Sequence, residues 1–88
     1  MKNCLYILLC SNNHYYIGST EDLEARLAAH QRGHTKSTRY IRPLILFYSQ
    51  SFKTILEARR AERWLKAQKS REFIEKLAKE GKITKRFS

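Results

Sequence analysis

Residues 4–18, with the sequence CLYILLCSNNHYYIG, carry the strongest structural signal in this chain. Residues 4–10 form a short apolar run that is typical of a buried strand. Ser11-Asn12-Asn13 has turn chemistry, because asparagine tolerates left-handed backbone angles. Residues 14–18 are a second run of strand-forming residues, so the whole stretch is predicted to form a β-hairpin.

The length of the turn decides which side chains of this hairpin share a face. A three-residue loop at 11–13 pairs Tyr6 with Gly18 and places Tyr6 and Tyr16 on one face as diagonal neighbours. A loop one residue shorter or longer would place the two tyrosines on opposite faces. Gly18 has no side chain, so it is expected to leave open space beside the Tyr6 phenol that a ligand could use. The alternative is that the two tyrosines only pack against their neighbours and form no ligand site, since strands favour aromatic residues.

Capping and turn residues define the elements that follow the hairpin. Ser19 or Thr20 can cap a helix that Gly33 closes, and Ser70 can cap a last helix that Gly81 ends. Between them the sequence predicts a basic loop at 34–42, a strand at 44–49 after Pro43, and a helix at 54–68. The predicted fold is α/β (α+β): one domain over residues 1–88, with a small central antiparallel three-stranded sheet, flanking helices and the order β-β-α-β-α-α.

The charge of the chain indicates a polyanionic partner. Its 88 residues include 18 Lys and Arg against 8 Asp and Glu, a net charge of +10, of which residues 45–88 carry +7. A domain this small and this cationic most often contacts nucleic acid. Charge alone does not separate a binding protein from a nuclease.

Apolar patterning and cysteine content indicate where the protein works. No apolar run approaches the ~18 residues of a membrane span, so no membrane contact is expected. Cys4 and Cys10 lie about 20 Å apart along one predicted strand, too far for a disulfide. With no further cysteine they are not a metal pair either. We therefore expect a reduced, cytoplasmic protein.

The first predicted helix carries a histidine where an aliphatic residue is expected. Leu23, Leu27 and His30 recur at helical spacing, so His30 continues the inward stripe. Arg26 lies four positions earlier and neighbours it on the helix surface. Two cationic groups so placed repel each other, and their proximity is favourable only where an anion such as phosphate lies between them. The alternative is a neutral, hydrogen-bonded His30 with Arg26 extending to solvent.

The helix at 54–68 carries a carboxylate, Glu62, beside its apolar stripe. A carboxylate in that position is usually paired or coordinates a metal. Arg59, Arg63 and Lys66 are close enough on the same helix to form an ion pair with it. Near a phosphate-binding surface, however, a lone carboxylate repels the substrate. A divalent cation removes that conflict, since Mg²⁺ takes one or two carboxylates together with phosphate oxygens.

Taken together, these positions resemble the GIY-YIG nuclease family over about residues 3–75. Tyr6 and the segment Tyr16-Ile17-Gly18 correspond to its two half-motifs, with Cys4-Leu5 where the first has Gly-Ile. The other matching patterns are Arg-x-x-x-His at 26–30 and Ala-x-x-x-Glu at 58–62 with Lys66 after it. Length and basicity resemble the family's small stand-alone bacterial members. The family's asparagine, about a dozen residues past the glutamate, is replaced here by Ile74.

The resemblance implies a metal-dependent endonuclease that hydrolyses DNA phosphodiesters, in structured or damaged DNA during repair or recombination. It implies that Glu62 holds Mg²⁺ or Mn²⁺ and Arg26 the scissile phosphate. One of Tyr6 and Tyr16 would deprotonate or position the water while the other orients it, and which does which stays open. The implied catalytic set is Tyr6, Tyr16, Arg26, His30 and Glu62.

Basic residues outside this set are expected to follow the nucleic-acid backbone. They are Lys36, Arg39 and Arg42 in the loop, with Lys66 and Lys69 as substitutes for the missing asparagine contact. The alternative function is a non-catalytic nucleic-acid-binding module that retains the fold. DNA is favoured as the substrate, and a third interpretation is an RNA-directed nuclease or ribosome-associated factor. Whether a partner protein targets the chain to its substrate stays unknown.

Overall fold

Strand β1 (Cys4–Leu9) is the centre of the sheet in the computed structural model, which describes residues 3–87. It pairs antiparallel with β2 (Tyr15–Thr20) on one side and with β3 (Ile45–Ser51) on the other. The strand order is β2-β1-β3, so the predicted three-stranded antiparallel sheet is confirmed. Because β1 is covered on both faces, its sequence is a continuous apolar run.

The predicted hairpin register is also confirmed. Tyr6 lies opposite Gly18, and the turn is closed by a hydrogen bond from the Cys10 amide to the His14 carbonyl at 2.9 Å. Asn13 adopts a left-handed backbone conformation with φ 69°, which asparagine tolerates better than most residues. The turn chemistry therefore places Tyr6 and Tyr16 on the same face, with ring centroids 6.3 Å apart.

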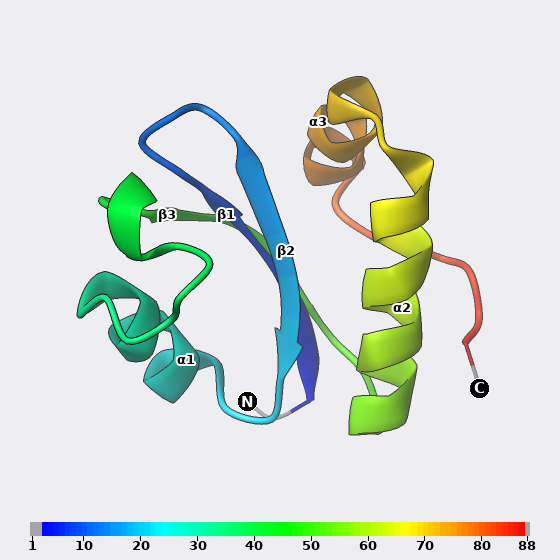
Figure 1. Ribbon diagram of the computed structural model, residues 1–88. Helices are drawn as coiled ribbons and strands as arrows, with labels where there is room; N and C mark the ends of the chain where they lie inside the picture. The colour runs from blue at the N-terminus through cyan, green and yellow to red at the C-terminus, as the bar shows by residue number, and fades with distance from the viewer. Residues whose placement is uncertain (1–2, 88) are drawn as a thin grey trace.

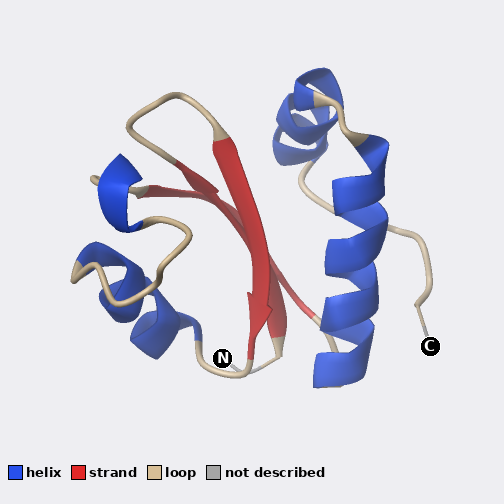
Figure 2. Ribbon diagram, viewed as in Figure 1, coloured by secondary structure: helices blue, strands red, loops and turns tan. Residues whose placement is uncertain are grey.

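Helices cover both faces of the sheet (Figures 1 and 2). The helix α1 and a short 3₁₀ turn lie on one side, while α2 and α3 lie on the other. The element order β-β-α-β-α-α is as predicted. The helical segments are α1 (Leu23–Gln31), the 3₁₀ turn η1 (Arg39–Ile41), α2 (Ile55–Gln68) and α3 (Arg71–Glu80).

The cap predicted for the first helix is wrong. Asp22, not Ser19 or Thr20, caps α1, since its carboxylate accepts a hydrogen bond from the Ala25 amide at 3.2 Å. Ser19 and Thr20 extend β2 instead, because they pair with residues of β1. The backbone pairing of the sheet therefore delays the start of the helix by three residues relative to the Ser19 prediction. Ser70 and Gly81 bound α3 as predicted.

Two apolar clusters fill the layers, and β1 contributes to both by strict alternation. Leu5 and Ile7 face α2 and α3, where the larger cluster includes Leu65 and Ile74. Tyr6 belongs to the smaller cluster on the α1 side. A polar side chain on the central strand thus lies at the core of one layer and close to the edge strand β2.

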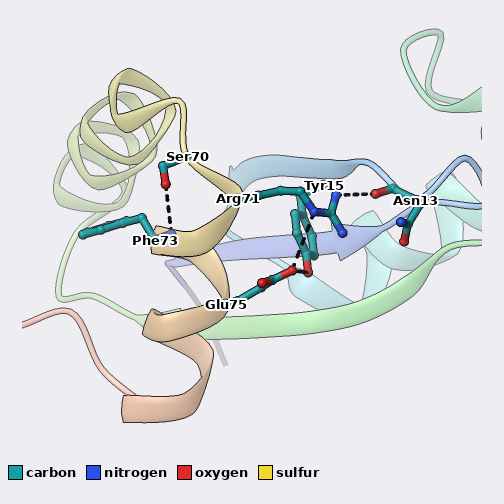
Figure 3. A network of polar contacts seen from close by, with 6 residues as sticks. All are labelled: Asn13, Tyr15, Ser70, Arg71, Phe73 and Glu75. Atoms are coloured by element: carbon teal, nitrogen blue, oxygen red, sulfur yellow. Dashed lines mark hydrogen bonds and ion pairs between the residues drawn. The ribbon is translucent and has the colours of Figure 1, made fainter.

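Polar contacts attach α3 to the hairpin, as Figure 3 shows. The Arg71 guanidinium lies over the Tyr15 ring, 4.5 Å from its centroid, and donates to the Asn13 carbonyl. Tyr15 Oη donates to the Glu75 carboxylate at 3.2 Å. These contacts fix the tip of the hairpin against the layer formed by α2 and α3.

Two further observations concern the whole described chain. Cys4 and Cys10 are both free and buried, as predicted. Within residues 3–87 no helix is long and apolar enough to cross a bilayer.

Candidate active site

A cleft of about 450 Å³ lies along β2, the edge strand of the sheet. Residues from both faces of the sheet reach it, because β2 is an edge strand and no further strand within residues 3–87 pairs with its outer side. Arg26 comes from α1 on one side, and Glu62 comes from α2 on the other. The lining residues are Tyr6, Tyr16, Gly18, Ser19, Arg26, Arg59, Glu62, Arg63 and Lys66.

Gly18 lets Tyr6 reach this cleft from the central strand. A Cβ atom at Gly18 would lie 2.5 Å from Tyr6 Oη and 2.6 Å from its Cζ, so only glycine permits the ring to lie there. The ring fills the position that a Gly18 side chain would take. The open space predicted beside the phenol is the cleft itself, which Tyr6 and Gly18 both line.

The Tyr6 phenol is almost fully buried, and its surroundings keep it protonated. Only 2% of the residue is exposed. Burial is the main cause that raises the pKa of Tyr6 well above its ordinary value, and the neighbouring Tyr16 and Glu62 raise it further, while Arg26 lowers it. Tyr16 is only partly buried and lines the cleft.

His30 does not line the cleft but lies behind Tyr6. It is completely buried, and its Nε2 lies 3.0 Å from Tyr6 Oη. Its Nδ1 lies 2.8 Å from Thr38 Oγ1. Burial, followed by the charge of Arg26, lowers the pKa of His30, so the imidazole is neutral near pH 7. The structure thus has the neutral, hydrogen-bonded histidine of the second interpretation, with both ring nitrogens facing protein partners.

Glu62 is the acidic residue of the cleft lining, and both of its oxygens have partners. Ser19 Oγ donates to Oε1 at 2.5 Å, and Lys66 Nζ lies 2.7 Å from Oε2. The Glu62 side chain is 21% exposed, while that of Lys66 is 54% exposed and therefore free to turn toward solvent. The predicted intrahelical ion pair is present, with Lys66 as the partner.

Three arginines give the cleft its positive charge. Arg26, Arg59 and Arg63 are exposed, and within residues 3–87 their guanidinium groups make no hydrogen bond or ion pair. They can therefore bind an anion without breaking an existing contact. Arg59 and Arg63 were considered in the sequence only as partners for Glu62. Their spacing of four on one helix was the signal that both face the same surface.

Ser19 and Thr38 are the polar contacts that sequence reasoning missed. Ser19 follows directly on the Tyr16-Ile17-Gly18 motif, and strand alternation could have indicated that it faces the α2 side. Thr38 had no such signal, because its loop is otherwise polar and basic. It is nevertheless completely buried.

The other residues predicted to bind substrate lie outside the cleft lining. Lys36 is exposed in the loop before β3 and Arg39 is exposed at the start of η1, while Lys69 is the left-handed residue that ends α2. Arg42 donates to the backbone carbonyls of Arg39 and Gln31, so it holds the loop against the end of α1. Of the five residues only Lys66 lines the cleft.

Ile74, which replaces the family's asparagine, belongs to the larger apolar cluster. It lies on the buried face of α3 and is 7% exposed. The corresponding polar contact is therefore not made from this position.

The donor set of the cleft fits a hard divalent cation held by one carboxylate. Residues 3–87 contain no group of three or more His, Cys, Asp or Glu that would enclose a metal. Mg²⁺ does not need such a group, since it commonly keeps several waters and takes substrate phosphate oxygens beside a single carboxylate. Glu62 supplies that carboxylate next to arginines that suit phosphate.

Comparison with known proteins identifies the family of this chain. The GIY-YIG catalytic domain family matches residues 2–78. A UPF0213 protein of Bacillus velezensis is 42% identical over 74 residues, which cover 80% of this chain and 75% of that protein. A UPF0213 protein of Streptococcus pneumoniae is 44% identical over 69 residues, covering 77% and 70%.

A solved structure has the same fold. The solution NMR structure of a UPF0213 protein from Bacillus halodurans superposes with a TM-score of 0.57 at 34% identity, covering 90% of this chain and 84% of that one. The family match spans both tyrosines, the two helices that line the cleft and Glu62. This chain therefore belongs to the GIY-YIG nuclease family.

Proposed function

We propose that this protein is a divalent-metal-dependent endonuclease that hydrolyses phosphodiester bonds in DNA, with structured or damaged DNA as its substrate in repair or recombination. The observation that carries the proposal is the convergence of Tyr6, Tyr16, Arg26 and Glu62 on one cationic cleft. His30, the fifth residue of the predicted set, contacts the cleft through Tyr6. Two free buried thiols support a reducing compartment, for which we propose the cytoplasm.

The three unpaired arginines bind the substrate backbone in this proposal. A phosphodiester has two charged nonbridging oxygens, and guanidinium groups bind such oxygens through paired, charge-assisted hydrogen bonds. Arg26 reaches the cleft from the side of the tyrosines, so it is the group we assign to the scissile phosphate. Arg59 and Arg63 on α2 then hold the flanking phosphates.

The two tyrosines differ in exposure, and their proposed roles follow from it. Tyr16 is the phenol that water in the cleft can reach, so we assign to it, in its deprotonated phenolate form, the acceptance of the attacking water's proton. Tyr6 is buried and stays protonated, so we assign to it the donation of a hydrogen bond that orients the water or the phosphate. His30 fixes the position of the Tyr6 oxygen.

Glu62 is the residue that would hold the metal. A bound Mg²⁺ or Mn²⁺ would supply Lewis-acid polarisation of the phosphate and stabilise the charge on the leaving 3′ oxygen. Ser19 keeps the carboxylate aimed at the cleft, because it donates to Oε1. Lys66 neutralises Oε2 in the free protein and, being half-exposed, can turn away toward a phosphate.

Two observations favour a second candidate, a non-catalytic nucleic-acid-binding module. Glu62 has a cationic partner already in place at 2.7 Å, and the family's asparagine position is apolar. Such a module would use the same arginines for binding and would need no metal.

A nicking assay separates the two candidates. The purified chain is incubated with supercoiled, branched and single-stranded DNA, and with RNA, in the presence of Mg²⁺ or Mn²⁺. We expect cleavage of DNA that EDTA abolishes and that Glu62→Gln lacks, while Glu62→Gln still binds the substrate. Glu72→Gln on α3 is the matched control, because that exposed carboxylate lies outside the cleft lining. Binding without cleavage under every condition would establish the second candidate instead.

A further inference from the structure

Thr38 is the one completely buried side chain in an otherwise exposed basic segment. Its neighbours Lys36, Ser37, Arg39 and Tyr40 are exposed, whereas Thr38 has no exposed surface. A buried hydroxyl needs a hydrogen-bond partner, because leaving it unpaired is costly. The partner of Thr38 Oγ1 is His30 Nδ1 at 2.8 Å.

A continuous chain of polar contacts runs from this hydroxyl to the cleft. It passes from Thr38 Oγ1 to His30 Nδ1, through the ring to Nε2, and on to Tyr6 Oη at 3.0 Å. Tyr6 lines the cleft, while Thr38 and His30 have no exposed surface. Both ring nitrogens of His30 are therefore occupied, one on each side.

Counting the protons gives this series of hydrogen bonds a direction. A neutral imidazole has one N–H donor and one lone-pair nitrogen, and a hydroxyl has a single proton to donate. Within residues 3–87 the Thr38 hydroxyl has no acceptor other than His30 Nδ1, so its proton must point there. Nδ1 is then the acceptor, and the ring proton is on Nε2, which donates to Tyr6 Oη. Tyr6 in turn can direct its own proton into the cleft that it lines.

We propose that Thr38 is a positioning residue: its hydroxyl fixes His30 as the Nε2–H tautomer, so that Tyr6 receives a hydrogen bond from His30 and directs its own proton at the substrate. The expected effect of Thr38 on cleavage rests on the proposed function, whereas its effect on the His30 tautomer does not. Under the opposite tautomer Tyr6 would donate to His30 and have no proton left for the cleft. Thr38 acts on the reaction through His30 and touches no substrate itself.

The tautomer can be measured without any activity. In ¹⁵N-labelled protein near pH 7.5, two-bond nitrogen–proton correlations of the His30 ring are expected to give a pyridine-type Nδ1 and a pyrrole-type Nε2. The reverse assignment would overturn the proposal, whether or not the protein cleaves DNA. Absence of cleavage in the unmodified protein would contradict the proposed function alone, so the two failures are distinguishable.

Two variants test whether Thr38 sets the tautomer. Thr38→Val keeps the shape but removes the hydroxyl, so that Tyr6 can pair with either tautomer, and the two nitrogen resonances are expected to move toward averaged values. Thr38→Ser restores the hydroxyl and should restore the resonances of the unmodified protein. A folded Thr38→Val variant with unchanged ring shifts would show that Thr38 does not select the tautomer.

Cleavage kinetics give the second readout. Thr38→Val is expected to reduce kcat by roughly 10–100-fold with little change in KM, the range typical of losing the partner that orients a metal-bound histidine. Thr38→Ser should recover most of that loss. A purely structural role would lower the unfolding free energy of both variants without this split between kcat and KM, and would count against the proposal.

Discussion

Gly18→Ala is expected to destabilise the protein because the new methyl group would meet the Tyr6 ring. A Cβ at this position lies 2.5 Å from Tyr6 Oη and 2.6 Å from Cζ, well inside van der Waals contact. The backbone of β2 cannot retreat, since Gly18 pairs with Tyr6 in the sheet. The ring must therefore leave its position, and its hydrogen bond to His30 breaks.

The size of the effect follows from these two losses. Overfilling a packed site typically costs about 1–3 kcal/mol. Leaving the buried His30 nitrogen without its partner costs a further ~1–3 kcal/mol. The cleft relieves part of the clash, so we expect the free energy of unfolding to fall by about 2–4 kcal/mol in total. For a domain of this length that corresponds to a Tm lower by roughly 10 °C or more.

Urea denaturation followed by fluorescence of Trp64, the single tryptophan of the chain, measures the change. In a Tyr6→Leu background the three atoms nearest to the new methyl are gone, so Gly18→Ala should cost less than about 0.5 kcal/mol there. Gly81→Ala is the control for the chemical change itself. Its Cβ meets nothing within 4 Å, and only the left-handed φ of 93° costs about 1–2 kcal/mol. An equal loss for Gly18→Ala with and without the Tyr6 ring would refute the steric argument.

Three further outcomes are expected. Burial lowers the pKa of His30 in the folded protein, so on acidification the unfolded chain takes up a proton on this residue before the folded protein does. The contribution of His30 to stability is therefore complete above about pH 6.5 and falls as the pH drops toward the lowered pKa. Urea titrations at about pH 7.5 and 5.5 measure this difference, and His30→Leu should remove it. Arg63→Ala should weaken DNA binding and reduce the slope of log K against log salt by about 0.9, which corresponds to the loss of one phosphate contact. Lys79→Ala, on the exposed part of α3, is the control and should leave the slope unchanged. Arg71→Ala loses a carbonyl hydrogen bond and the contact with the Tyr15 ring, so unfolding should become easier by about 1–2 kcal/mol, and an unchanged Tm would contradict this.

Local chemistry was enough to predict most of the fold. The apolar run of β1, the Asn-containing turn and the capping residue Ser70 act through neighbours in the chain, and each produced the expected element. Ser19 and Thr20 are the instructive exception. Both are good capping residues, yet their backbone groups pair with β1, and hydrogen bonding within the sheet prevented the helix from starting there.

In the candidate site, too, some features were predictable from local sequence and others depended on distant residues. Strand register placed Tyr6, Tyr16 and Gly18 together, because a three-residue turn permits only one alternation of side chains. The direction of the Tyr6 ring was not available from register. It depends on a histidine 24 positions away, and the ring fills the space that the missing Gly18 side chain leaves.

What remained for the tertiary structure is the set of contacts between residues distant in sequence. Ser19 meets Glu62 across 43 positions because α2 packs on the face of β2 opposite to α1, and Thr38 meets His30 because a basic loop folds back over α1. A pattern of residue types records which side chains prefer water and which backbone angles are permitted. It does not record which hydroxyl satisfies which buried nitrogen, since that pairing arises only when the packed layers leave a polar atom no other partner.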